Sequence, residues 1–512
     1  MTEPAQKSGL TVRAFWLMFA KALAFVLGFA LPLLLVRRLS QYEFGLYKQV
    51  FLVVSTSIAV LPLGFSLSAY YFLPREEGER RASVVLNILC FNAAIGLAVF
   101  LLLLIKPAIL SSLFGSQTVV SYAPLIGLVI LLWISAVFIE IAAISNQEAK
   151  LATLFIVFAQ FSKTAFLVVA AVGFGTIRSL LYAAIVHGIA QNVLLLFYLR
   201  ARFPKFWRRF DWAMMRRQLS YALPIGFAGL VFGLLIDMHN YIVSYRFGAA
   251  AFAIYAVGCF SLPLVNIVGE SFGAILIPHI SALQKQKATR EIVFVTAQTM
   301  RKLSLVYFPL YVFLLVMGRE FLTVLFTKQY LASWPVFVVH LTTLPFFILI
   351  TDPIMRAYAE HRFFLLKVRL VTVVLLFVAL WFGTMRFGLV GAIAIMVIFS
   401  LTDRFVETAK AWSIIGVKWT DAVLLKDIGK VAVAATVAGM AALLTRSALI
   451  SAGVVLLGVL AVSAAVFGSV YLVAVALLGV VTPGERSAIR HRVEALQPRR
   501  NGRRVPNLTE AS

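Results

Sequence analysis

Two lysines and two acids fall inside long apolar stretches of this 512-residue chain. Lys21 and Lys163 lie in the first half of the chain, and Asp237 and Glu270 lie in the second. A charged side chain at the centre of a membrane-spanning helix costs about 2.5–3.5 kcal/mol on insertion scales, so it normally faces a partner or a water-filled cavity. These four residues are therefore the first candidates for binding or for coupling to an ion.

Further polar residues accompany the four at helical spacing, where positions three or four apart share a face. His239 adjoins Asp237 and is grouped with it. The spaced pairs are Gln160 with Lys163, His187 with Gln191, Asp237 with Asn240 and Tyr241, and Asn266 with Glu270. Two interpretations remain open: the stripes line a wet cavity, or the charges pair with one another inside the bundle.

The composition predicts a membrane protein built of helices. The chain is 62% hydrophobic and 13% charged, with a mean hydropathy of +0.96, far from the averages of soluble domains. Its net charge of +25 is explained by basic loops on one side of a membrane, so no nucleic-acid partner is expected. Cys90 and Cys259 both fall in apolar segments, and neither a metal site, a cofactor nor a catalytic residue is predicted.

About fourteen apolar segments are long enough to span the membrane. The expected spans are 14–36, 47–73, 84–105, 119–143, 152–174, 179–199, 218–244, 250–277, 299–318, 331–354, 363–383, 388–408, 430–447 and 451–481. With the N-terminus inside, the alternating segments hold 34 Lys and Arg residues inside and 10 outside, and Lys48 is counted with the outside loops. This bias predicts that both termini are cytoplasmic.

An internal repeat predicts the architecture. The spacing of Arg, Phe and Tyr in residues 38–47 recurs 208 residues later in residues 246–255, and FGTIR at 174–178 recurs as FGTMR at 382–386 with the same offset. Six helices separate equivalent points, so we expect two six-helix lobes in a parallel pseudo-twofold repeat, plus two C-terminal helices. The predicted divisions are an N-terminal tail (1–13), an N-lobe (14–203), a basic linker (204–217), a C-lobe (218–415), two last helices (416–482) and a basic tail (483–512).

Three groups of polar residues are expected on the cytoplasmic side. The basic linker, with Trp207 and Trp212, is interpreted as lying at headgroup level, with a partner's docking surface as the alternative. The basic tail is expected near anionic lipid. A third set is predicted to form ion pairs that close the inner side, as a gate that breaks on opening: Glu140, Asp352, Arg356, Asp403, Arg404 and Glu407.

Three stretches resemble polysaccharide transporters of the multidrug/oligosaccharidyl-lipid/polysaccharide exporter superfamily, in the branch of O-antigen and exopolysaccharide flippases. RRLSQYEFGLYKQVF at 37–51 is similar to the turn after their first helix. YALP at 221–224, Asp237 and RFGAAAFAIYAVG at 246–258 are similar to their seventh and eighth helices. The resemblance runs from the first expected helix to the twelfth.

The resemblance implies a multi-pass flippase of the bacterial inner membrane, used in polysaccharide or lipopolysaccharide biosynthesis. Its cavity would open alternately to the cytoplasm and periplasm and turn over a polyprenyl-pyrophosphate-linked oligosaccharide, alongside a glycan polymerase and a chain-length regulator. Lys21, Lys163 and Gln160 would receive the pyrophosphate, although the resemblance implies Arg rather than Lys there. Asp237, His239 and Glu270 are assigned to coupling by a proton or sodium ion, or to charge balance.

Two other functions compete with the flippase. A multidrug antiporter of the same fold would use Asp237 and Glu270 as cation sites, and Lys21 would then be unfavourable. A membrane glycan polymerase or ligase would need an extended outside loop with a polar constellation. The expected outside loops are short and contain only Glu43 and Glu320 as acids, which disfavours an enzyme.

Overall fold

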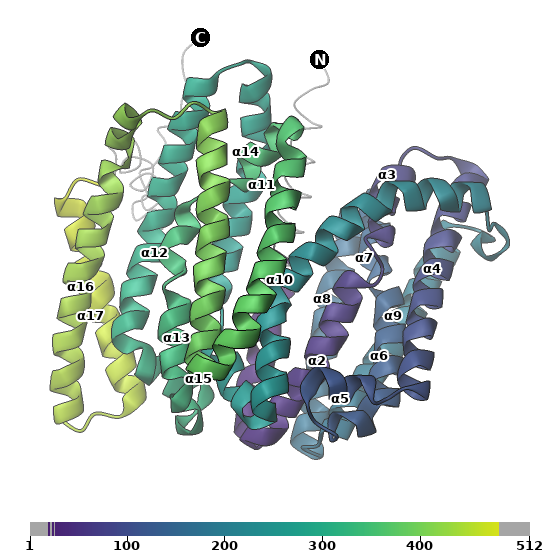
Figure 1. The fold of residues 1–512 in the computed structure, drawn as a ribbon, viewed down its shortest axis with the longest axis horizontal. Helices are drawn as coiled ribbons and strands as arrows, with labels where there is room; N and C mark the ends of the chain where they lie inside the picture. Colours follow the sequence, from purple (N-terminus) through teal and green to yellow (C-terminus); the bar gives the residue numbers. More distant parts are fainter. Residues whose placement is uncertain (1–18, 21–22, 25, 481–512) are drawn as a thin grey trace, which may run out of the picture. The chain divides into compact units, whose positions relative to one another are not determined.

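The computed structural model describes residues 19–20, 23–24 and 26–480, and their regular secondary structure is entirely helical (Figure 1). This confirms the all-α prediction. Residues 26–38 form the end of the first helix. The N-lobe continues with α2 (Gln41–Val60), η1 (Phe65–Leu67), α3 (Ser68–Phe72), α4 (Gly78–Ile105), α5 (Ile109–Phe114), η2 (Val119–Tyr122), α6 (Ala123–Ala136), α7 (Phe138–Ser145), α8 (Ala149–Gly173) and α9 (Ile177–Arg202).

The second half begins with a short 3-10 turn. Its elements are η3 (Phe206–Arg208), α10 (Trp212–Gly258), α11 (Pro263–Lys285), α12 (Thr289–Phe326), η4 (Lys328–Ser333), α13 (Trp334–Leu341), η5 (Leu344–Ile348), α14 (Asp352–Ala357), η6 (Ala359–His361), α15 (Arg362–Ile414), η7 (Trp419–Leu425), α16 (Lys426–Ser451) and α17 (Leu456–Leu477). Eleven helices of the described residues are long and apolar enough to cross a membrane, or twelve if the bent pair Gln41–Val60 and Phe65–Phe72 is one span. The chain is a multi-pass membrane protein, and the number fourteen stays a prediction.

Two of the long helices double back on themselves at a glycine. Gly248 in α10 (φ 75°) and Gly388 in α15 (φ 62°) leave the helical conformation with a positive φ, which glycine adopts without a Cβ penalty. Across the first turn, His239 Nδ1 lies 2.7 Å from the Tyr255 hydroxyl. Across the second, Arg369 and Glu407 form a 2.8 Å ion pair. Each helix therefore consists of two antiparallel arms.

The expected span 250–277 is not one continuous helix. The second arm of α10 ends at Gly258, and α11 begins only at Pro263. Pro263 occupies the first helical position of α11, where its missing N–H costs nothing and its fixed φ favours the start of a helix. The hydrophobic run continues across this break, which is why apolarity alone did not reveal it.

The positions of the turns reflect the internal repeat, but one of the two sequence matches is displaced from the corresponding turn in the structure. The first helix ends just before Ser40, which caps α2, and Gly248 lies 208 residues later at the turn of α10. At the second match, Gly175 (φ 62°) forms the turn between α8 and α9, whereas Gly383 lies inside the first arm of α15. The equivalent turn is at Gly388, 213 residues after Gly175. Phe387–Gly388, not FGTMR, is the structural counterpart of Phe174–Gly175.

The two lobes meet where α2 and the first arm of α10 run antiparallel. We call this contact, residues 45–63 against 226–249, the α2–α10 seam. A Cβ on Gly45 would lie 1.8 Å from the Ala249 carbonyl oxygen, and a Cβ on Gly226 would lie 2.0 Å from the Leu63 carbonyl oxygen. Such approaches of one backbone to another are possible only at glycine, as in other membrane helix pairs with small residues at the contact.

Polar side chains join the two helices between these glycines. The Gln49 side-chain amide donates a 2.7 Å hydrogen bond to Ser244 Oγ, and both residues are buried. Further along, the Thr56 hydroxyl donates to Asp237 Oδ2 at 2.7 Å. Polar bonds between apolar helices fix their register, because a slip would leave buried donors and acceptors unpaired.

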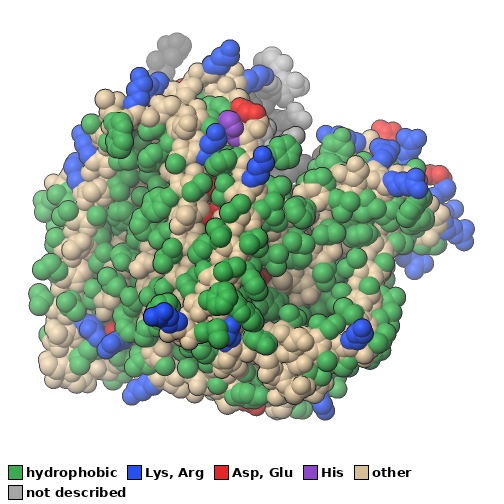
Figure 2. All heavy atoms as spheres, in the orientation of Figure 1, with side chains coloured by type: hydrophobic (Ala, Val, Ile, Leu, Met, Phe, Trp, Pro, Cys, Tyr) green, Lys and Arg blue, Asp and Glu red, His purple; other side chains and the backbone are tan. Residues whose placement is uncertain are grey.

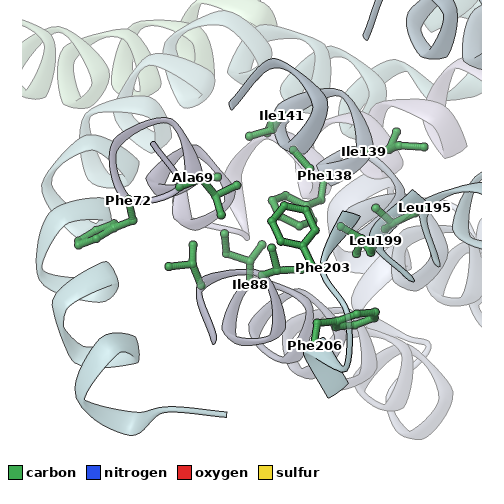
Figure 3. Packing of buried hydrophobic residues seen from close by; sticks show 14 of the residues in the cluster. Ala69, Phe72, Ile88, Phe138, Ile139, Ile141, Leu195, Leu199, Phe203 and Phe206 are labelled. Atoms are coloured by element: carbon green, nitrogen blue, oxygen red, sulfur yellow. The ribbon is translucent and has the colours of Figure 1, made fainter. Parts of the chain in front are cut away.

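A separate apolar cluster holds one end of the N-lobe together (Figure 3). Phe138 and Phe203 pack against each other with Ile88 beside them, and Leu195, Leu199 and Phe206 lie along the same cluster. The loop after α9 is thereby anchored through Phe203 and Phe206, which are 4% and 5% exposed.

Among the described residues, 297–317 of α12 and 418–480 form a second compact unit. The small residues Ala434, Ala435, Ala438 and Ala442 lie on one face of α16 and are fully buried. The Tyr471 hydroxyl of α17 donates to the Leu305 carbonyl at 2.9 Å. The sequence did not predict that part of α12 belongs to this unit, and the boundary at 416 stays a prediction.

Hydrophobic side chains cover much of the surface. Figure 2 shows hydrophobic side chains over much of the visible face. Large apolar residues such as Phe174, Phe197 and Leu444 are 69–75% exposed. Exposed apolar surface of this extent is expected against hydrocarbon rather than water.

The seam predicts a position-dependent response to one added methyl group. Gly226→Ala would force the α10 backbone away from Leu63, and we expect it to destabilise the fold by about 1–3 kcal/mol. Gly229→Ala, on the same helix with no atom within 4 Å of its new Cβ, should leave stability unchanged or slightly higher. Thermal unfolding of the two purified variants measures the difference, and equal melting temperatures would contradict the close approach.

Candidate functional site

A cavity of about 740 Å³ lies between the two lobes. The N-lobe contributes the first helix, α2 and α8, and the C-lobe contributes the second arm of α10, α11 and Phe326. Its polar lining consists of Lys48, Gln160, Lys163, Asn266, Glu270 and the hydroxyl groups of Ser261 and Ser271. We call this space the central cavity.

Two smaller cavities adjoin it, of about 420 and 350 Å³. Gln160 and Lys163 line all three, so these two residues lie where the spaces meet. The sequence placed Gln160 and Lys163 on one helical face, and in the structure both residues line the central cavity. The Gln160 amide donates to the Thr164 hydroxyl at 3.3 Å, which orients its carbonyl and amide along the wall.

The central cavity holds two cations. Lys163 Nζ lies 5.9 Å from the centre of the Trp133 ring, and Lys48 Nζ lies 5.5 Å from the centre of the Phe44 ring. Within the described part of the chain, neither lysine forms an ion pair. Aromatic faces stabilise a partly desolvated ammonium while leaving its N–H groups available to another ligand.

Lys48 was wrongly assigned to an outside loop. The structure places it in the second turn of α2, which begins at Gln41 rather than at the expected residue 47. A signal for the earlier start was present: Ser40 and Glu43 form a reciprocal capping box, the Ser/Thr-x-x-Glu pattern of a helix N-terminus. With Lys21 outside the described residues, Lys48 and Lys163 are the cavity cations that the structure shows.

The C-lobe candidates Asp237, His239 and Glu270 do not share one site. Glu270 lines the central cavity from α11, within a turn of Asn266. Asp237 lies in the α2–α10 seam, bonded to Thr56, and lines none of the three cavities. His239 is buried against the Tyr255 hydroxyl across the turn of α10. The sequence spacing of Asp237 and His239 did not reveal that they point to different neighbours.

The predicted gate residues also separate. Asp352 and Arg356 pair with each other along α14 at 2.7 Å, and both are exposed. Arg404 donates to the Leu349 carbonyl at 3.2 Å, and Glu407 pairs with Arg369, a partner that the sequence did not predict. These contacts lie within the C-lobe.

The two remaining members of the gate lie apart from those pairs. Glu140 lines the 350 Å³ cavity together with His187, whose Nδ1 is 3.1 Å from the Ser162 hydroxyl. One carboxylate oxygen of Asp403 is buried and has no hydrogen-bond partner among the described residues. Their role in a gate stays a prediction.

One end of the lobe contact is closed by side chains that bond to carbonyl groups. Arg37, at the end of the first helix, donates to the Val324 and Leu325 carbonyls at 2.7 and 2.8 Å. Gln329 donates to the Val36 carbonyl at 3.0 Å. The turn between the first helix and α2 is thereby attached to the end of α12 and to η4.

The hydrogen bond between Thr56 and Asp237 in the seam predicts how two substitutions change stability. Thr56→Val removes the donor and leaves a half-buried carboxylate without its partner, so we expect a loss of about 1–3 kcal/mol. Asp237→Asn retains an oxygen that accepts from Thr56 and should lose less. Urea or thermal unfolding of both variants checks the order, and a more damaging Asp237→Asn would contradict a role of this hydrogen bond in stability.

The architecture is that of two-lobed membrane transporters. The lipid II flippase MurJ in an inward closed conformation matches with a TM-score of 0.68 and 14% identity over 92% of this chain and 99% of that one. A multidrug resistance MATE family transporter of the MOP superfamily, inward-facing, matches with a TM-score of 0.54 and 15% identity over 78% and 94%. A MOP superfamily transporter from Pyrococcus furiosus, whose binding pocket has reverse polarity, matches with 0.57 and 12% over 79% and 95%.

The sequence assigns the chain to a family within this architecture. A profile described as polysaccharide biosynthesis protein matches residues 34–335, and the chain belongs to that family. No curated protein sequence matches the chain significantly. Family and fold together confirm the resemblance that the stretches 37–51, 221–224 and 246–258 indicated.

Proposed function

We propose that this protein is a flippase of the bacterial inner membrane that moves a polyprenyl-pyrophosphate-linked oligosaccharide from the cytoplasmic to the periplasmic leaflet by alternating access. The observation that carries the proposal is the pair Lys48 and Lys163 in the central cavity, in a member of a polysaccharide biosynthesis family. Both termini would be cytoplasmic, as the charge bias of the loops predicts.

The cavity cations suit a pyrophosphate group. An ammonium in a membrane-spanning helix costs up to about 3 kcal/mol on insertion scales, so two of them consume a sizeable part of a typical folding stability of about 5–15 kcal/mol. Keeping both free of ion pairs is expected where a ligand supplies the countercharge. Lys21, on the same expected helix as Gly28, would add a third cation.

The broken helix adds a further favourable feature. Phe260 and Ser261, between α10 and α11, line the central cavity, so the N-terminal end of α11 lies beside it. A helix N-terminus carries a partial positive charge and free N–H groups, which favour an anion. Neutral sugars would then contact Gln160, Asn266 and the serine hydroxyls, whose donors and acceptors match hydroxyl groups.

The acids are assigned to coupling or charge balance. Glu270 shares the cavity with the lysines, where it can offset their charge when substrate is absent. Asp237, in the seam between lobes, is positioned to sense a rearrangement of α2 against α10 on binding a proton or sodium ion. A glycan polymerase and a chain-length regulator are the proposed partners, as consumers of the translocated unit.

A multidrug antiporter is the second candidate, because Glu270 lines the cavity and solved MATE transporters share the fold. An organic cation would meet two unpaired lysines there, and like charges in a site disfavour the ligand. A glycan polymerase or ligase is a weaker candidate than either transporter.

Removing the cavity cations should stop export. Lys48→Ala and Lys163→Ala each delete a charge-assisted contact, for which about 1.5–3 kcal/mol, or roughly 10- to 100-fold in substrate affinity, is expected. In a deletion strain, the double variant should leave complete lipid-linked glycan on the cytoplasmic face, measured with a membrane-impermeant lectin on spheroplasts. Lys106→Ala, an exposed lysine after α4, is the matched control and should restore export.

The same assay separates the candidates. If the glycan pool and its sidedness are unchanged in the deletion strain while cells become sensitive to cationic drugs, the antiporter replaces the flippase. Full export by the Lys48→Ala/Lys163→Ala protein would remove the pyrophosphate role of the cavity.

The proposed role of Asp237 in coupling transport to an ion gradient leads to a separate prediction. Asp237→Asn keeps an acceptor for Thr56 but cannot take up a proton or hold a cation by charge. We expect this variant to fold and to lose the dependence of transport on a proton or sodium gradient, measured in proteoliposomes with each gradient imposed in turn. Unaltered gradient dependence would leave Asp237 with a structural role alone.

A further inference from the structure

Another polar cavity, of about 530 Å³, has no lining residue in common with the central cavity. The start of α4 and the end of α9 form its walls, with the loop that follows α9. Its lining residues are Gly78, Glu79, Arg81, Ala82, Arg202, Phe203, Pro204, Lys205 and Arg209. We call it the loop pocket.

Four cations line the loop pocket, and two of them are already paired. Arg202 forms a 2.8 Å ion pair with Glu148, and Arg209 pairs with Glu79. Within the described residues, Arg81 and Lys205 have no acidic partner. The loop pocket therefore carries an excess of two positive charges. One doubly charged phosphate group, or two singly charged ones, would supply the negative countercharge.

Arg81 is fixed in place but not saturated. Its Nη2 donates to the Asn146 side-chain oxygen at 2.5 Å, and its guanidinium lies 5.6 Å from the centre of the Phe203 ring. Its Nε is buried and has no hydrogen-bond partner in the described part of the chain. A guanidinium has five N–H donors in a planar fork that matches phosphate oxygens, so a buried unpaired N–H is a cost that an anion would remove.

The backbone around the loop pocket is also held in one conformation. Phe203 and Phe206 anchor the loop in the apolar cluster (Figure 3), and Lys205 between them has φ 56°, in the left-handed region. On the opposite wall, α4 begins at Gly78 without a side-chain cap on its first N–H groups. A loop that is anchored on both sides presents its lysine with little entropy left to lose on binding.

The segment next to the loop pocket carries aromatic side chains that are exposed on the protein surface. Trp207, Phe210 and Trp212 are 48%, 50% and 55% exposed. Tryptophan is enriched where headgroups meet acyl chains, and cations close to anionic lipid each add about 1 kcal/mol of attraction. We therefore expect the cationic pocket and its aromatic neighbours at the depth of phospholipid headgroups, on the side that the charge bias predicts to be cytoplasmic.

From this juxtaposition we propose that the loop pocket binds the phosphate headgroup of an anionic phospholipid, with Arg81 and Lys205 as ligands and the aromatic residues 207–212 against its glycerol and acyl region. This lipid site is distinct from the central cavity and does not depend on the transported substrate. A headgroup held there would connect α4 to the loop that leads into α10, and so attach the N-lobe to the helix of the α2–α10 seam.

The test uses the purified full-length chain in detergent and native mass spectrometry with added phosphatidylglycerol, against zwitterionic phosphatidylcholine. Lys205→Asn is the principal variant, because asparagine tolerates the left-handed conformation and the fold should be retained. We expect its phosphatidylglycerol affinity to fall about five-fold, and that of Arg81→Gln/Lys205→Asn about 25-fold. Phosphatidylcholine binding should not change.

Lys106→Gln/Arg178→Gln is the matched control, since it removes two exposed cations from the opposite ends of α4 and α9. It should bind phosphatidylglycerol as the unmodified protein does. Equal affinity in the loop-pocket variants, or an equal loss in the control, would overturn the proposal. Displacement of the bound phosphatidylglycerol by millimolar glycerol 3-phosphate, with glycerol 3-phosphate alone raising the melting temperature, would assign the loop pocket to a soluble phosphate compound and overturn the lipid.

Discussion

The contact of α2 with the first arm of α10 is the constraint on which the arrangement of both lobes depends. Backbone approaches at Gly45 and Gly226 bring the helices together at the two ends of the seam, and Gln49–Ser244 and Thr56–Asp237 fix their register between them. In an apolar environment, hydrophobic burial does little to distinguish one helix pairing from another, so close packing and hydrogen bonds decide it. The central cavity lies beside this seam, since Phe44 and Lys48 of α2 line it.

The polar residues inside the bundle have different surroundings because of where they lie relative to this seam. Lys48 and Lys163 line the central cavity, Glu270 lines it from α11, and Asp237 accepts a hydrogen bond within the seam itself. The proposed substrate anion and the proposed coupling cation are therefore assigned to separate places in the structure.

The basic residues on the surface are likewise separate from those that line the central cavity. The basic residues of the loop after α9 do not reach the central cavity; they surround a pocket whose aromatic neighbours point outward. In a membrane protein, cations have at least three distinct uses: topology, substrate binding and attachment to lipid. Local geometry, not the total charge of +25, separates them here.

The sequence by itself determined the helical class, the many apolar spans, the repeat with its turn 208 residues after Ser40, and the family, because hydropathy and turn chemistry are local properties. It also placed Gln160 and Lys163 on one face. It did not place Lys48 in the cavity, separate Asp237 from Glu270, or pair Glu407 with Arg369, because these relations arise between residues far apart in the chain. Helical periodicity states which side chains share a face, and only the packing of the helices decides what that face meets.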